Sequence, residues 1–247
     1  MQVIAGRTFG ALKIAIQSLK DLYSTPIPFL KPGELTPKCP YQQHYMQSPD
    51  IRQEFSYDEV QSDRNQLIFY GETVKGETPR KICIKFVRQY SPEAHNFCAR
   101  KGHAPELIAY EHLPGGWNMV VMDVLQIHDG DQPPQPAGPY VPFSRIPFSD
   151  LQPMEKAVTA LIHDLHAYGY VHGDLRNNNF FVQDDGQVLT TANFMLLDFD
   201  WAGPIHKACY PMYVNRVGIH RPLDARDGRE IKVEHDLEML RYIFHPW

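Results

Sequence analysis

Three stretches of the chain repeat apolar residues at the spacing of one helix face. The stretches 154–167 and 233–244 each predict a helix that contributes one face to a core. The stretch 7–23 has polar residues between its apolar positions and therefore predicts an amphipathic helix. We expect its apolar face to pack on the same chain, with a partner protein as the alternative.

Between these helices lie short runs rich in branched and aromatic residues, bounded by glycine and proline. The runs 66–70, 81–87, 107–112 and 117–122 predict strands that are joined by turns. An earlier strand at 54–60 would complete an antiparallel sheet of five strands. The segment 25–49 shows no periodicity, so we expect an extended arm there.

The second of these strands carries a lysine among apolar neighbours. Side chains alternate along a strand, so Lys85 faces away from Ile84. A lysine in this position is usually an edge-strand or surface residue whose ammonium reaches water. Directly after the strand, Ser91 as a cap and Pro92 as a first helical residue predict the start of a helix.

The order of the elements predicts an α+β protein, because a block of strands precedes the long C-terminal helices. We expect four regions. They are an N-terminal helix with an extended arm at 1–50, a sheet region at 51–127, a proline-rich connector at 128–152 and a mainly helical region at 153–247.

Composition and charge narrow the class of protein. The chain of 247 residues has 43% hydrophobic residues and a net charge of -5, with no basic stripe. This excludes the usual nucleic-acid binders and proteins that bind anionic membranes. No apolar run is long enough for a bilayer and no secretory core begins the chain, so we expect an intracellular protein, cytoplasmic or nuclear. The four cysteines lack metal-ligand spacing, and nothing indicates an oligomeric state.

Candidate chemistry concentrates in the loop 171–182 and in the run 196–200. The loop holds a carboxylate, a cation and three amides, and an apolar strand-like run follows it. Phosphoryl transfer to a hydroxyl needs a carboxylate that orients the hydroxyl and takes its proton, and Asp174 fits this role. It also needs oxygen ligands for a metal, and Asn179 and Asp198 fit that role.

The spacing His172-x-Asp174-x4-Asn179, followed by Asp198-Phe199, resembles the catalytic and metal-binding loops of the protein-kinase-like superfamily. Gly173 and Asp200 make it similar to aminoglycoside and choline kinases, whereas the overall likeness is to divergent fungal proteins with protein-kinase domains. The resemblance implies a bilobal fold. The small lobe at 51–127 would hold an antiparallel sheet, and the large lobe at 153–247 would be truncated and mainly helical.

The resemblance also implies roles for single residues. Lys85 would bind the nucleotide phosphates, and Arg176 would add positive charge near the transferred phosphoryl group. Glu93 would pair with Lys85, although a first-turn acid favoured by the helix dipole is an equal alternative. Asp236 resembles the helix aspartate that supports the catalytic loop, and an ordinary N-terminal acid is again the alternative.

The adenine would bind at the kinase-like hinge, formed by Val121, Met122, Asp123 and Leu125. One departure concerns the phosphates. The segment 61–65 has no glycine, where kinases carry a glycine-rich loop that covers them.

The expected activity is therefore transfer of the γ-phosphoryl group of ATP to a hydroxyl, with ATP and Mg²⁺ as cofactors. A Ser/Thr protein-kinase-like enzyme is the first expectation, and the acceptor itself is not identified by these residues. A small-molecule kinase is one alternative. A pseudokinase that binds or scaffolds without transferring is the other, and the missing glycines favour it.

Overall fold

The computed structural model describes residues 2–24, 42–48, 50–60, 67–74, 79–127, 140–183 and 194–246. Contacts divide the chain into two units, Met1–Lys38 and Cys39–Trp247, and each is described by itself. None of the helices in these ranges is both long and apolar enough to cross a bilayer.

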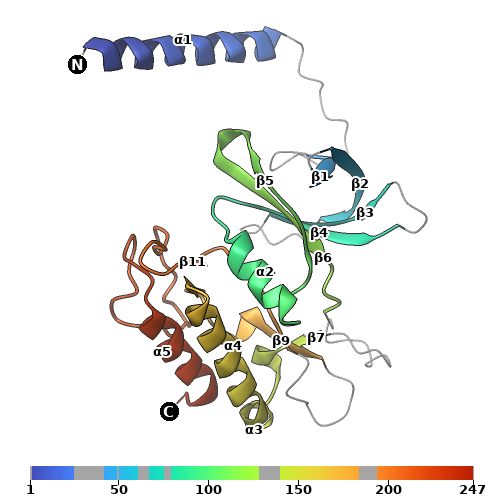
Figure 1. Cartoon of the computed structure of the whole chain (residues 1–247), viewed down its shortest axis with the longest axis vertical. Helices are drawn as coiled ribbons and strands as arrows, with labels where there is room; N and C mark the ends of the chain where they lie inside the picture. Colours follow the sequence, from blue (N-terminus) through green and yellow to red (C-terminus); the bar gives the residue numbers. More distant parts are fainter. Residues whose placement is uncertain are drawn as a thin grey trace. The chain divides into compact units, whose positions relative to one another are not determined.

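The described part of the first unit is the helix α1 (Gln2–Ser24), which confirms the helix expected at 7–23 (Figure 1). Its apolar side chains lie exposed within this unit, as Phe9 and Leu12 illustrate. Gln17 bonds the carboxylate of Asp21 one turn later, at 2.9 Å.

The second unit begins with an antiparallel sheet of six strands in the order β1-β2-β3-β4-β6-β5 (Figure 1). The strands are β1 (His44–Ser48), β2 (Ile51–Val60), β3 (Leu67–Thr73), β4 (Lys81–Val87), β5 (Leu107–Leu113) and β6 (Trp117–Asp123). A turn, Pro114–Gly116, joins β5 to β6. The four later strands and the early strand at 54–60 are all present.

The sixth strand, β1, was not expected from the sequence. It lies in the segment 25–49, which we expected to be an extended arm, and it pairs antiparallel with β2. Burial explains the pairing, since Tyr45 is almost fully enclosed and its ring stacks on Phe55. One buried aromatic residue among polar neighbours gives too little alternation to indicate a strand.

The two faces of the sheet belong to different cores. Ile84 in β4 and Val121 in β6 pack with the aromatic residues of β1 to β3 on one face. Val87 and Val120 face the helix α2 (Pro92–Arg100) and the later helices on the other. The cap expected for α2 is present, because the Ser91 hydroxyl accepts from the Ala94 amide.

The later part of this unit is built from short elements around two helices, α4 (Glu155–Ala167) and α5 (Val233–Phe244), which contact each other. β7 (Tyr140–Pro142), β9 (Phe180–Gln183) and β10 (Phe194–Leu196) form one small sheet, and β8 (Tyr170–Val171) pairs with β11 (Gly203–Pro204). Single turns of helix complete it: Phe143–Arg145, α3 (Phe148–Leu151), Gln152–Met154 and Asn177–Asn179.

The N-terminal turn of α5 holds the loop after β8 in place. The carboxylate of Asp236 is fully buried and accepts the backbone amides of His172 and Gly173, each at 2.8 Å. Its second oxygen also lies 2.9 Å from Nε2 of His166 in α4. Asp236 therefore ties α4, α5 and the loop together, as the resemblance implied and an ordinary N-terminal acid would not.

We predict that Asp236→Ala lowers the free energy of unfolding by about 3–5 kcal/mol, because it leaves buried donors without an acceptor. Glu238→Ala on the same helix is the control. Glu238 is exposed and pairs with His220 near the surface, so its loss should cost no more than about 1 kcal/mol. Urea unfolding of both variants measures the difference, and equal losses would contradict the supporting role of Asp236.

Candidate active site

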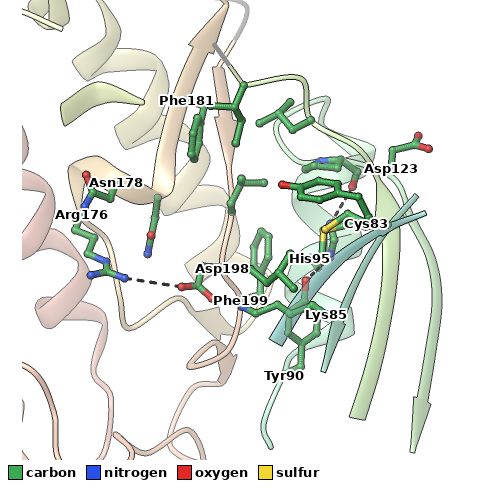
Figure 2. Close-up of a pocket in the computed structure, with 18 of the residues that line it drawn as sticks. Cys83, Lys85, Tyr90, His95, Asp123, Arg176, Asn178, Phe181, Asp198 and Phe199 are labelled. Atoms are coloured by element: carbon green, nitrogen blue, oxygen red, sulfur yellow. Dashed lines mark hydrogen bonds and ion pairs between the residues drawn. The ribbon is translucent and has the colours of Figure 1, made fainter. Parts of the chain in front are cut away.

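A cavity of about 610 Å³ lies between the six-stranded sheet and the loops of the later part of the second unit (Figure 2). The sheet side is lined by residues of β3, β4 and the end of β6. The opposite side is lined by the loop 176–179, by Phe181 of β9 and by Leu197–Phe199. The strand β4 and the loop 176–179, which lie far apart in the sequence, thus line the same cavity.

Three of the four expected hinge residues reach this cavity. Met122, Asp123 and Leu125 line it. Val121 is fully buried with the core on the other face of the sheet, because its neighbours along the strand point to the cavity side. Asp123 is also held at the rim, where its carboxylate accepts from Nε of Arg80 at 2.8 Å.

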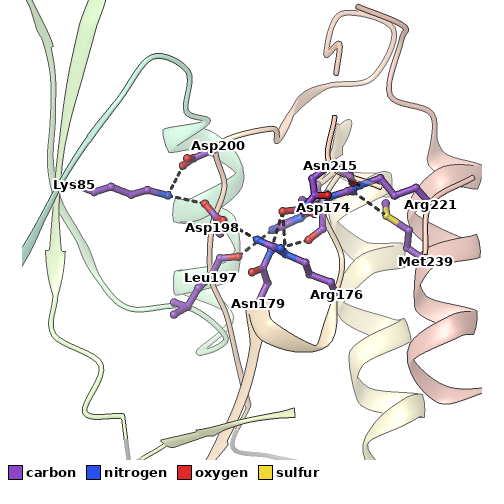
Figure 3. A network of polar contacts seen from close by, with 11 residues as sticks. Lys85, Asp174, Arg176, Asn179, Leu197, Asp198, Asp200, Asn215, Arg221 and Met239 are labelled. Atoms are coloured by element: carbon purple, nitrogen blue, oxygen red, sulfur yellow. Dashed lines mark hydrogen bonds and ion pairs between the residues drawn. The ribbon is translucent and has the colours of Figure 1, made fainter. Parts of the chain in front are cut away.

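The side chain of Lys85 extends from β4 to a pair of carboxylates (Figure 3). Its ammonium lies 2.6 Å from Oδ1 of Asp198 and 2.6 Å from Oδ1 of Asp200, and its side chain is only 7% exposed. Burial alone would lower the pKa of Lys85, but the two carboxylates raise it above its ordinary value. Lys85 is therefore a buried cation, and not the surface lysine that its strand position would suggest.

The two carboxylates respond differently to the shared ammonium. Burial raises the pKa of Asp200. Burial would also raise the pKa of Asp198, but the Lys85 ammonium outweighs it and lowers that pKa. Asp198 thus stays ionised at neutral pH. Its backbone, in addition, adopts a left-handed conformation at φ 68°. Such strain in a residue with a side chain costs energy and is found mainly where function requires it.

The structure does not bring Glu93 into contact with Lys85. Glu93 is exposed on the first turn of α2, and its carboxylate accepts from the hydroxyl of Ser91 at 3.5 Å. Asp200 occupies the position at Lys85 that the resemblance assigned to Glu93. The alternative of a first-turn acid, favoured by the helix dipole, accounts for Glu93.

A second α2 residue, His95, reaches the cavity although the sequence suggested no role for it. Its ring stacks on Phe199 with the centroids 4.8 Å apart, and it lies between the Tyr90 hydroxyl and the carbonyl of Pro105. Burial lowers the pKa of His95 to about 4, so the ring is neutral at pH 7. His95 thereby fixes the residue next to Asp198.

The catalytic-loop residues meet around one buried carboxylate. Oδ2 of Asp174 lies 3.2 Å from Nδ2 of Asn179 and 3.3 Å from Nε of Arg176. Arg176 also lies 4.0 Å from Asp198, so it spans the two candidate loops (Figure 2). Oδ1 of Asp174 accepts from Arg221 at 2.6 Å. Asp174 itself does not line the cavity, whereas Arg176 and Asn179 do.

Arg221 was missed by the sequence analysis. It lies in the segment 210–229, which has no periodicity and which we did not connect with the loop 171–182. No local pattern distinguishes it from the other arginines of that segment. Its contact with Asp174 depends on tertiary folding alone.

The oxygens at the cavity suit a hard divalent cation. Nδ2 of Asn179 donates to the carbonyl of Asp174 at 2.8 Å, which leaves the amide oxygen of Asn179 available. Oδ1 of Asp198 is paired with Lys85, and its Oδ2 faces Arg176. One amide oxygen and one ionised carboxylate are ligands that Mg²⁺ accepts together with phosphate oxygens.

Gly173 is a glycine for a packing reason. Its φ is 81°, and a Cβ there would lie 2.8 Å from Cδ1 of Ile231, closer than side chains approach each other. The neighbouring His172 is buried and lies 3.3 Å from the carbonyl of Leu197. The two loops are therefore packed together at this point.

Comparison with known proteins supports a kinase-like class. Residues 150–209, which include Asp174, Asn179 and Asp198, match the lipopolysaccharide kinase (Kdo/WaaP) family. No curated protein matches the chain. Among solved structures, the Cydia pomonella granulovirus kinase PK-1 is similar over 78% of this chain and 69% of that chain, with a TM-score of 0.54 and 12% identity.

The fold is therefore that of a protein kinase, a mixed α and β structure with an antiparallel sheet. The two findings together support the protein-kinase-like superfamily that the paired motifs indicated. The family match, which includes the loop 171–182, also supports a phosphotransferase of the kinase type.

We predict that Gly173→Ala is more destabilising than Gly102→Ala. Both glycines have similar positive φ, at 81° and 79°, but nothing lies within 4 Å of a Cβ at Gly102. Gly102→Ala should cost about 1 kcal/mol of backbone strain. Gly173→Ala should cost about 1–3 kcal/mol more, because Ile231 has to move. Thermal unfolding compares them, and equal shifts would show that the contact with Ile231 does not require glycine.

Proposed function

We propose that the protein is an ATP- and Mg²⁺-dependent phosphotransferase that moves the γ-phosphoryl group of ATP to a hydroxyl. One observation carries the proposal: Lys85 from the sheet, Asn179 and Asp198 from separate loops, and Arg176 line one cavity. In this reading residues 51–127 are the small lobe, 153–247 are a shortened large lobe, and 128–152 connect them. The segments 128–139 and 61–65 lie outside the described residues.

The sheet side of the cavity would bind the nucleotide. Met122 would contact the adenine, and the backbone at Asp123 and Leu125 would offer it hydrogen bonds. Lys85 would bind the α- and β-phosphates. Val121 would support this wall from the core behind it, since it faces away from the cavity.

The loop side would supply the chemistry. Asn179 and Asp198 would hold Mg²⁺, which neutralises charge on the phosphates when it is bound. Asp174 would orient the acceptor hydroxyl and take its proton, and Arg176 would balance charge on the transferred phosphoryl group. Arg176 lies 3.3 Å from Asp174 and 4.0 Å from Asp198, which supports a place between the acceptor and the phosphate.

We retain a Ser/Thr protein-kinase-like acceptor as the first candidate. Gly173 had favoured a small-molecule kinase, but its packing against Ile231 explains the glycine without reference to any acceptor. Asp200, the other residue that favoured a small molecule, has a role in holding Lys85.

The first test is the melting temperature with and without ATP and Mg²⁺. A ligand at a hundredfold excess over its dissociation constant should stabilise the protein by about 2.7 kcal/mol, or about 5 °C at this size. Asp198→Asn should abolish the metal-dependent part of the shift, since Asn also tolerates positive φ but lacks the charge. The surface substitution Asp164→Asn is the control. A metal-dependent shift that survives in Asp198→Asn would count against Asp198 as a ligand.

A second prediction concerns the residue that holds Lys85. Asp200→Asn should weaken binding of ATP with Mg²⁺ by about tenfold, because the freed ammonium pairs more closely with the metal ligand Asp198. Glu93→Gln should change the affinity less than Asp200→Asn, because Glu93 does not contact Lys85. Isothermal titration calorimetry measures both. A larger loss of ATP affinity in Glu93→Gln than in Asp200→Asn would instead indicate that Glu93 is the partner of Lys85.

A further inference from the structure

Arg221 lies between β11 and α5 in the sequence, yet its side chain is buried beneath the catalytic loop with 1% exposure. Its Nη2 donates to Oδ1 of Asp174 at 2.6 Å, and its Nε donates to the carbonyl of Asn215 at 2.8 Å (Figure 3). The guanidinium also covers the ring of Trp201, with its carbon 4.4 Å from the ring centroid. Arg221 thus joins three separate segments.

The backbone that carries Arg221 is itself held in place. The guanidinium of Arg216 donates to the carbonyls of Pro222 at 2.9 Å and of Arg221 at 3.5 Å, and also to that of Ala225. Behind the guanidinium, Nη1 of Arg221 lies 3.8 Å from the sulfur of Met239 in α5. The side chain is therefore a built part of the fold and not a surface arginine that happens to meet a carboxylate.

This contact makes the two oxygens of Asp174 unequal. Oδ1 is occupied by a buried guanidinium, whereas Oδ2 is turned to Asn179 and Arg176, the neighbours that line the cavity. A charge-assisted hydrogen bond of 2.6 Å fixes the carboxylate more firmly than a neutral one would. Of the two oxygens, Oδ2 is therefore the one beside residues that line the cavity, and we assign the acceptor hydroxyl to it.

The same guanidinium also sets one wall of the cavity. Asn215 lines the cavity, and Arg221 holds its carbonyl. We propose that Arg221 is a positioning residue. It holds Oδ2 of Asp174 and the part of the cavity wall at Asn215 in fixed positions relative to each other, so that the acceptor hydroxyl meets the base at the right angle. This rests on the proposed phosphotransferase function.

A removable latch over Asp174 is the competing interpretation, and the geometry disfavours it. Releasing Arg221 would leave a buried guanidinium without a charged partner and Oδ1 of Asp174 without a donor, which is unfavourable. It would also break the bond to Asn215 and the contact with Trp201. Lysine cannot reproduce the planar fork that makes these contacts together, so Arg221→Lys keeps the charge and loses the positioning.

The experiment measures Mg²⁺-dependent hydrolysis of ATP, with water as the acceptor, together with ATP affinity by calorimetry. Arg221→Lys should lower kcat on the order of 100-fold, the effect of a displaced catalytic group, and leave the ATP dissociation constant within about threefold. Arg226→Lys is the matched control, because Arg226 lies exposed in the same segment and, among the described residues, its side chain bonds only the carbonyl of Leu223. It should behave as the wild type.

An unchanged kcat in Arg221→Lys overturns the proposal, and so does a rise in kcat, which would indicate a latch. A parallel loss of ATP affinity indicates a purely structural role and also overturns it. If Arg221→Lys fails to fold, Trp201→Leu removes the ring beneath the guanidinium and should lower kcat in the same selective way. A wild-type protein that binds ATP without hydrolysing it overturns the proposed function and this inference together, whereas an active wild type with unaffected variants overturns this inference alone.

Discussion

The site depends on the burial of the Lys85 ammonium between two carboxylates. A buried charge is tolerated only when it is paired, so β4 and the Asp198 loop must meet at this point. Because β4 lies inside the six-stranded sheet and the loop follows β10, the ion pairs bring the two sides of the cavity together. The cavity and the polar groups that line it follow from this contact.

A second set of buried contacts holds the candidate catalytic loop in place. Asp236 accepts two consecutive backbone amides, Gly173 packs against Ile231, and Arg221 holds Asp174. These contacts come from α5 and from the irregular segment before it. The irregular segment before α5 therefore contributes to the orientation of the candidate base. Its conformation is fixed by these contacts with the loop.

The exchange of Glu93 for Asp200 changes how the lysine is controlled. When a helix residue pairs with the strand lysine, movement of that helix can make or break the pair. Here the carboxylate lies two residues from Asp198, on the same loop. Both carboxylates that pair with Lys85 thus lie on one segment, and α2 contacts that segment through the stacking of His95 on Phe199.

The sequence by itself indicated the kinase-like class, most strands and the helices, because these follow from periodicity and from motifs whose members lie within a few residues of one another. Asp174 and Asn179 stood out as candidates because they lie close together in one loop, and Asp198 because it directly precedes Phe199. The tertiary structure alone decided that Met122 and not Val121 reaches the cavity, since the sheet's two buried faces are both apolar. It alone paired Lys85 with Asp200, enclosed Tyr45 in an added strand, and brought Arg221 to Asp174. Each of these is a long-range contact between buried groups, and the partner of a buried group is set by which segments fold against each other, which no local pattern records.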